Sequence, residues 1–216
     1  MKQMNIGILL FPQADVLDFA GPYEVFNMAT WDQKDVKKLL ANNLDAAEKP
    51  FSVRTVTENG MQVSLNNGLL VQPDCSFNSA PQFDAVVVPG GPFGSIKKTC
   101  SNQKIIDWIR MQADHALILS VCTGAFLLAE SSLLHGKKAT THHAALLYLH
   151  KMYPEINVQE QVRFTDEGDV MTSAGVSAGM DLALHAVAKL LNEEAAVRTA
   201  SVIEYGEGGQ KCMKSS

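Results

Sequence analysis

Short, continuously apolar runs alternate along the chain with longer stretches in which apolar residues recur at helical spacing. The runs at residues 4–11, 83–89 and 116–121 are typical of strands that are buried on both faces of a parallel sheet. Helical periodicity is found over residues 102–114, 124–134, 143–152, 177–191 and 193–205. Strands that alternate with helices predict an α/β domain, in which a mainly parallel sheet carries helices on both faces.

The remaining segments give weaker signals. Residues 51–57 alternate as a strand does, and Gly21-Pro22 is expected to open a helix over residues 23–28. Further expectations are a hairpin over residues 60–71 that turns at 66–68, a short strand at 138–141, and two strands at 158–164 and 169–173. The polar stretch 30–49 is predicted to be a surface helix or a surface loop excursion. Residues 206–216 are predicted to be a frayed end.

Composition is that of an ordinary globular domain. The 216 residues are 46% hydrophobic and 19% charged, which suits a single domain over residues 1–216. No apolar run approaches the ~18 residues of a membrane-spanning helix, and no signal peptide is recognised, so we expect a cytoplasmic protein without a membrane partner. The net charge of −5 and the scattered basic residues argue against nucleic acid as a partner.

Four cysteines, at positions 75, 100, 122 and 212, make thiol chemistry the next question. None belongs to a Cys-x-x-Cys motif, so neither a zinc ribbon nor a thioredoxin-type redox site is indicated. In a reducing cytosol all four are expected to be thiols. A paired His142-His143 without cysteine or acidic partners at ligand spacing is weak support for metal, and we predict no metal site.

Cys122 has the sequence context of a nucleophile. It stands directly between the apolar strand that ends at Val121 and a helix rich in Ala and Leu, with Gly124 and Ala125 as the small neighbours that a tight turn needs. A thiol at a helix N-terminus is expected to have a lowered pKa. The alternative is a buried structural cysteine, because free cysteines are among the most buried residues.

Other candidates follow the carboxyl ends of the first two buried strands, where ligands bind in open parallel sheets. Gly90 and Gly91 can offer backbone N–H groups to a developing anion, or simply make a tight turn. Asp18 beside a thiolate would have a raised pKa and could exchange a proton, although an aspartate here is also a common helix cap. His142 could act as a base toward Cys122, but packing or capping is the simpler interpretation.

Several segments together resemble the ThiJ/PfpI superfamily, which has the class I glutamine-amidotransferase-like, flavodoxin-type fold. The resemblance rests on SVCTGAFLLAESSLLHGKKATTH (120–142), LLFPQADVLDFAGPYEVF (9–26), VVVPGG (86–91) and VMTSAGVSAGMDLALHAVAKLL (170–191). It implies a flavodoxin-like three-layer sandwich and a homodimer. It covers nearly the whole chain except residues 30–49 and the C-terminal end.

Two branches of that superfamily are most similar. One is isocyanide hydratase. Its cysteine, the threonine after it and an aspartate on the first loop match Cys122, Thr123 and Asp18. Glu204-Tyr205 is also similar to that branch. The other is the amidase-like domain of AraC-type regulators, which carry a C-terminal helix-turn-helix domain for which this sequence is expected to have no room. Members described as proteases have histidine after the cysteine and a glutamate on the first loop. Thr123 and Asp18 stand at those positions here, so they argue against peptidase activity and weaken the case for glyoxalase activity.

The resemblance implies a cofactor-free hydratase that acts on a small-molecule substrate. Cys122 would attack the terminal carbon of an isocyanide, Asp18 would move the protons, and Thr123 would position Asp18 or water through its hydroxyl. Two alternatives stay open. One is another cysteine hydrolase, amidase or glyoxalase-like enzyme, and the other is a non-enzymatic redox or ligand sensor.

Overall fold

The computed structural model describes residues 2–206. Its strands are β1 (Met4–Leu9), β2 (Phe51–Thr57), β3 (Val63–Ser64), β4 (Leu70–Val71), β5 (Cys75–Ser76), β6 (Ala85–Val88), β7 (Leu117–Val121), β8 (Lys138–Ala139), β9 (Asn157–Val158), β10 (Phe164–Asp166) and β11 (Val170–Ser173). Its α-helices are α1 (Val16–Asn27), α2 (Gln33–Leu40), α3 (Phe93–Cys100), α4 (Gln103–Ala113), α5 (Ala125–Glu130), α6 (Leu146–Met152), α7 (Ala178–Leu190) and α8 (Glu193–Val202). Short 3-10 turns are η1 (Ala46–Glu48), η2 (Asn66–Gly68), η3 (Cys122–Gly124) and η4 (His143–Ala145).

The central sheet has seven strands in the order β10-β11-β7-β6-β1-β2-β5. All neighbouring strands pair in parallel except β10 and β11, which form an antiparallel pair at one edge. The middle strand β6 is buried at every position, as its apolar run predicts for a strand covered on both faces.

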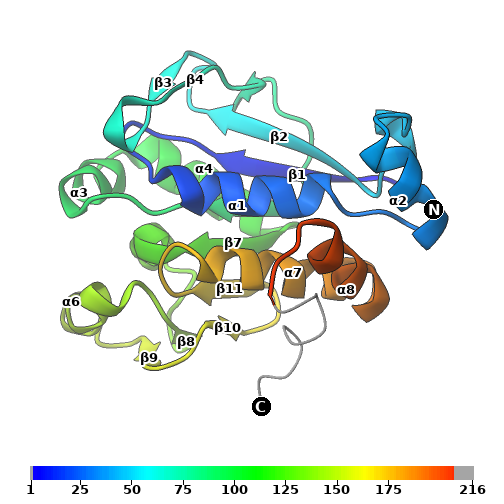
Figure 1. Cartoon of the computed structure of the whole chain (residues 1–216). Helices are drawn as coiled ribbons and strands as arrows, with labels where there is room; N and C mark the ends of the chain where they lie inside the picture. The colour runs from blue at the N-terminus through cyan, green and yellow to red at the C-terminus, as the bar shows by residue number, and fades with distance from the viewer. Residues whose placement is uncertain (1, 207–216) are drawn as a thin grey trace.

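Helices cover both faces of this sheet (Figure 1). The helices α1, α7 and α8 pack together on one face, while α3, α4 and α5 lie on the other. This confirms the predicted three-layer, flavodoxin-like α/β arrangement. Within residues 2–206 no helix has both the length and the apolar character needed to cross a bilayer.

The chain order reverses at the centre of the sheet. Strand β2 pairs with one side of β1 and β6 with the other, so the connections that leave β1 and β6 diverge at their carboxyl ends. Such a switch point leaves a crevice in which open α/β sheets bind ligands. The β3–β4 hairpin closes one side of it, because the Gln13 N–H donates to the Ser64 carbonyl oxygen and the Asn66 N–H to that of Ala14.

Two sequence expectations about helices are wrong. The first helix begins at Val16 rather than at residue 23, and it runs through Pro22, which places Asp18 in its first turn instead of in a loop. The helix α3 follows Pro92 where none was expected, because only two of its eight residues, Ile96 and Thr99, are buried, which is too few to give an apolar pattern. The hairpin turn at residues 66–68 is confirmed, and strand 51–57 is confirmed at the bounds predicted.

The polar segment 30–49 lies far from the crevice. It forms α2 and η1 beside the amino end of β1 (Figure 1), where the Gln3 side chain donates to the carbonyl oxygens of Ala46 and Lys49. The crevice opens at the carboxyl ends of the strands. The segment is therefore at the opposite end of the sheet and does not cover the site.

Candidate active site

Cys122 occupies a strained turn between β7 and α5. Its φ angle is 57°, in the left-handed region that residues with a side chain rarely adopt. The surrounding structure holds this conformation from both sides: the Cys122 N–H donates to the Ala174 carbonyl oxygen at 3.2 Å, and its carbonyl oxygen accepts from the Thr141 hydroxyl at 2.7 Å. The predicted sharp strand-to-helix turn is confirmed.

The elbow is pressed against the end of β6, and glycine makes this possible. A Cβ atom on Gly124 would overlap the Val88 carbonyl oxygen and lie 2.8 Å from that of Pro89. A Cβ on Gly90 would lie 2.6 Å from both the backbone nitrogen and the hydroxyl oxygen of Thr123. The prediction that the turn needs a small residue at position 124 is therefore confirmed, with backbone overlap as the reason.

Asp18 meets the elbow from the first turn of α1 and is fully buried. Its Oδ2 accepts a hydrogen bond from the Gly90 N–H at 3.0 Å, whereas Oδ1 has no hydrogen-bond partner in the described part of the chain. Burial, and next the negative charge of Asp15, raise the pKa of this carboxyl to about 7, against the weaker opposing effect of the Gly90 N–H. The raised pKa expected for Asp18 is confirmed, although burial and Asp15, and not a thiolate, cause it.

The thiol of Cys122 faces Asp18 and is itself nearly inaccessible, with 4% of the residue exposed. Burial and the neighbouring Asp18 charge raise the pKa of Cys122 to about 12, although the backbone N–H groups of Thr123 and Val176 favour the thiolate. The prediction of a lowered pKa is therefore wrong. The helix that follows, α5, has only six residues, and its end cannot offset desolvation and a nearby carboxylate.

Thr123 holds the glycine turn rather than the carboxyl itself. Its hydroxyl donates to the Gly91 carbonyl oxygen at 2.7 Å and accepts from the Gly91 N–H at 2.9 Å. Thr123 was expected to act directly on Asp18 or water. Its role on Asp18 is indirect, because this pair of hydrogen bonds fixes the turn from which the Gly90 N–H reaches Asp18. The N–H groups of Gly90 and Gly91 are both engaged, which corrects the prediction that they would be free to face an anion.

His142 lies beside the crevice without touching the thiol. Its Nδ1 accepts a hydrogen bond from the Ala144 N–H at 3.2 Å, and its ring lies against that of His143, tilted by 34° with 4.2 Å between centroids. Burial and the neighbouring His143 lower the pKa of His142, and no hydrogen bond joins the ring to Cys122 in the described part of the chain. The capping interpretation is confirmed. In the described residues no contact supports His142 as a base toward Cys122.

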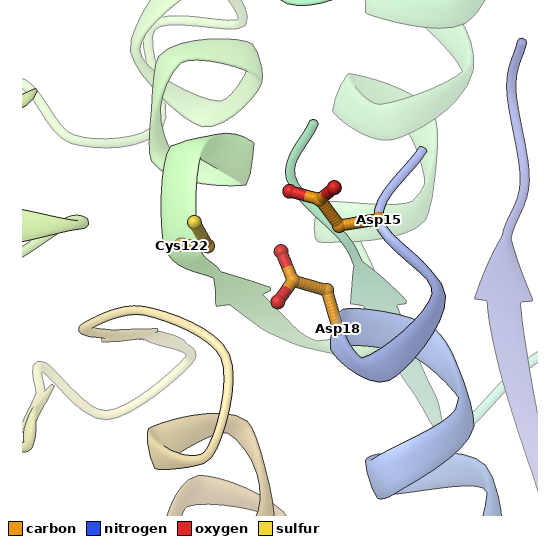
Figure 2. A group of neighbouring side chains, drawn as sticks. All are labelled: Asp15, Asp18 and Cys122. Carbon is orange, nitrogen blue, oxygen red and sulfur yellow. The ribbon is translucent and has the colours of Figure 1, made fainter. Parts of the chain in front are cut away.

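Asp15 completes the site, and sequence reasoning missed it. Figure 2 shows its carboxyl and that of Asp18 pointing toward Cys122 from the same side, and one ligand atom from each residue lies within 4.8 Å of the other two. The Asn66 side chain, on the β3–β4 hairpin, donates to Asp15 Oδ1 at 2.7 Å. The spacing of three residues between Asp15 and Asp18 at a helix start was the available signal, because both then face one side of the first turn.

The other cysteines lie elsewhere. Cys75 is buried in β5 and Cys100 ends α3, and burial raises the pKa of both thiols. Cys212 lies outside the described residues. The nucleophile candidate is thus the cysteine that stands at the switch point of the sheet, as the sequence predicts.

Comparison with known proteins places this architecture in a family. The model of the DJ-1/PfpI family matches residues 4–189. The chain belongs to the DJ-1/PfpI family. This confirms the resemblance drawn from the sequence segments around Cys122, Asp18 and Gly90-Gly91.

The relatives of this chain include both an enzyme and transcriptional regulators. The isonitrile hydratase of Pseudomonas putida is 31% identical over 204 residues, which cover 94% of this chain and 78% of that protein. The HTH-type transcriptional regulator GbdR of Pseudomonas aeruginosa is 26% identical over 93% of this chain, and the match spans 50% of the regulator. A ThiJ/PfpI family protein from Pseudomonas syringae superposes with a TM-score of 0.79 at 25% identity, covering 95% of this chain and 76% of that one.

Proposed function

We propose that this protein is a cysteine-dependent hydratase that converts isocyanides into N-substituted formamides. The observation that carries the proposal is the fully buried carboxyl of Asp18 facing the Cys122 thiol, with a pKa of about 7. A carboxyl with this pKa can take up and return a proton near neutral pH, as the hydration of an isocyanide requires. The similarity to the isonitrile hydratase over 94% of the chain supports the same reaction.

The first half of the reaction adds the thiol across the terminal carbon of the isocyanide. The Asp18 carboxylate removes the proton from Cys122 while the sulfur forms a bond to that carbon. The lone pair of the carbon then takes the proton back from Asp18. The result is a thioimidate, in which the carbon carries one hydrogen, is singly bonded to sulfur and is doubly bonded to nitrogen.

The second half replaces sulfur by oxygen. Asp18, again a carboxylate, removes a proton from water as the water oxygen attacks the thioimidate carbon, and it passes that proton to the nitrogen. The carbon–sulfur bond then breaks, sulfur leaves with the bonding electrons, and it recovers a proton as the hydroxyl becomes the formyl oxygen. One isocyanide and one water give one N-substituted formamide, and no electron is gained or lost overall.

The resting protonation state suits this sequence of steps. Burial and Asp18 keep the Cys122 thiol protonated at neutral pH, since its pKa is raised to about 12. A thiol of this kind needs a base at hand, and Asp18 is the carboxyl that faces it. The backbone N–H groups of Thr123 and Val176, which act on the sulfur, can favour the transient thiolate.

The test is formation of formamide from a simple alkyl isocyanide, followed by proton NMR against an enzyme-free control. We expect turnover by the unmodified protein and its loss in Cys122→Ala and Asp18→Ala, whereas Cys100→Ala and Asp32→Asn keep it. In deuterium oxide the formyl carbon gains deuterium, because Asp18 exchanges its proton with solvent. No Cys122-dependent formamide from alkyl and aryl isocyanides would refute the proposal.

A non-catalytic ligand-sensing role is the second candidate. It is favoured by the regulator GbdR, which is similar to 93% of this chain. Sensing of oxidants through Cys122 is disfavoured, because such cysteines combine exposure with a low pKa, and here burial raises the pKa to about 12. Binding of an isocyanide or another small electrophile that raises the unfolding temperature without turnover would support the sensing role instead.

A further inference from the structure

The second carboxylate of the site is held in place by groups outside the reaction. The Asp15 N–H donates to the Gly90 carbonyl oxygen at 2.9 Å, and the Asn66 side chain donates to Asp15 Oδ1 at 2.7 Å. The backbone and the side chain of Asp15 are thus both fixed, and the carboxyl points toward Cys122 (Figure 2). In the half-reactions above, Asp15 transfers no proton.

No lysine or arginine of residues 2–206 balances this carboxylate at the thiol. Cys122 and Asp18 act on each other, and Asp15 and backbone N–H groups act on both. No lysine or arginine of residues 2–206 is among the groups that shift their pKa values. The charge of Asp15 acts on His142, in the loop after β8, but burial and His143 lower the pKa of that ring and so favour its neutral form. The surroundings of the sulfur are therefore electronegative.

An unsatisfied acceptor lies in the same place. Asp18 Oδ1 is buried and has no hydrogen-bond partner among residues 2–206, although the Cys122 thiol and the Val176 N–H lie near enough to favour the carboxylate electrostatically. A buried acceptor without a donor is costly, and a ligand that brings an N–H group relieves that cost. This points to a donor on the molecule that approaches Cys122.

We propose that Asp15, which Asn66 holds in place, and the unpartnered Oδ1 of Asp18 form a subsite at Cys122 that accepts a cation or an N–H donor. It favours electrophiles with a positive charge or an N–H group beside the reacting carbon, and it disfavours anionic electrophiles such as those that carry a carboxylate. Asp15 is the specificity-determining residue of this subsite. The inference concerns access to the thiol, so it stands or falls separately from the hydration reaction.

Two thiol reagents of similar size and opposite charge test it directly. Aminoethyl methanethiosulfonate carries an ammonium and sulfonatoethyl methanethiosulfonate a sulfonate. In both, the Cys122 thiolate attacks the reagent's divalent sulfur, a disulfide bond forms, methanesulfinate leaves with the bonding electrons, and the thiol proton passes to water. Mass spectrometry of the Cys122 peptide gives each rate, and the urea-unfolded chain supplies the intrinsic ratio of the two rates.

We expect the folded protein to favour the cationic reagent about tenfold beyond the unfolded chain, as one nearby charge in a partly dry site implies. Asp15→Asn should bring the ratio close to that of the unfolded chain, and Asn66→Ala should lower it partially by releasing the carboxyl. The ratio cancels any change in thiol pKa, because that change affects both reagents equally. Asp32→Asn, which removes an exposed carboxylate on α2's N-cap, is the matched control and should leave the ratio unchanged.

Three results would overturn the inference. One is an equal preference in the folded and unfolded chains, and another is a cation preference that survives Asp15→Asn. The third is failure of the cationic reagent to modify Cys122 under conditions in which it modifies the half-buried Cys100, because an attractive entrance must admit it. Loss of isocyanide turnover with the charge preference intact would refute only the proposed reaction.

Discussion

The hydroxyl of Thr123 and the backbone of Gly91 exchange two hydrogen bonds, of 2.7 Å and 2.9 Å, across the centre of the site. These bonds join the nucleophile elbow to the turn after β6. The preceding residue, Gly90, donates from that turn to Asp18 at 3.0 Å. The thiol and the carboxyl are thus positioned against each other by one buried network, in which Thr123 acts on Asp18 through two glycines.

Replacing Thr123 with valine tests that network. Valine keeps the shape of the side chain but leaves the buried Gly91 N–H and carbonyl oxygen without partners, so we expect a loss of about 1–3 kcal/mol in the free energy of unfolding. Turnover should fall mainly through kcat, because Asp18 loses its alignment. Urea denaturation and steady-state kinetics measure the two effects. Thr123→Ser, which keeps the hydroxyl, should retain most of both, and a stable, fully active Thr123→Val protein would exclude the positioning role.

Asp18 should make stability fall as pH rises. Its pKa is raised from 3.8 to about 7 on folding, so the folded state binds the proton more tightly than the unfolded state. The stabilisation is complete below pH 3.8 and is lost as pH rises through about 7, by about 4 kcal/mol. Asp18→Asn cannot ionise, so we expect it to lose roughly 4 kcal/mol less than the unmodified protein between pH 4 and pH 8.5. Urea titrations at both pH values, with Asp32→Asn as the control, decide this, and parallel losses in the two proteins would contradict it.

The rate should depend on pH through the same carboxyl. The form that starts the reaction has a Cys122 thiol and an Asp18 carboxylate, so kcat/KM should rise with an apparent pKa near 7 and then level off, because the thiol titrates only near 12. Asp15 raises the pKa of Asp18, and Asp15→Asn should therefore move the rise to lower pH. The groups that face Asp18 are Asp15 and Cys122, with His142 facing Asp15. A rise at the same pH in both proteins would remove Asp15 from this role.

Gly124 and Gly94 form a matched pair for testing backbone crowding. A Cβ on Gly124 would overlap the Val88 carbonyl oxygen, so Gly124→Ala must displace the elbow or the end of β6. We expect a loss of about 2–4 kcal/mol and the loss of turnover. Gly94 lies in α3 with open space around its Cα, and Gly94→Ala should stabilise the protein by about 0.5–1 kcal/mol. Thermal unfolding of both variants checks this, and equal effects would show that the contact at Gly124 is not limiting.

Much of this molecule follows from local sequence pattern. The apolar runs at 4–11, 83–89 and 116–121 became β1, β6 and β7, since strands buried on both faces need continuous apolar residues. Their alternation with helices predicts the parallel sheet and its ligand-binding edge. The run that ends at Val121, with a small residue at 124, is enough to place Cys122 on the elbow.

Other features escaped the pattern because they depend on what surrounds a residue. A proline usually opens a helix, yet Pro22 lies within α1, which begins at Val16. The thiol was expected to have a low pKa because it precedes a helix, but desolvation and Asp18 prevail over the end of a six-residue helix. Segment 30–49 could be placed relative to the site only by its tertiary contacts, such as the hydrogen bonds that Gln3 and Arg198 donate to it.

The sequence by itself determined the layered α/β fold and the position of the candidate nucleophile on its turn, because these depend on periodicity and on residues close in the chain. Only the tertiary structure decided how the site is charged. Asp15, Asp18, Asn66 and Cys122 come from three separate parts of the chain and meet at the switch point of the sheet. Burial and mutual repulsion, which set the protonation of the thiol and the carboxyl, arise only from that meeting.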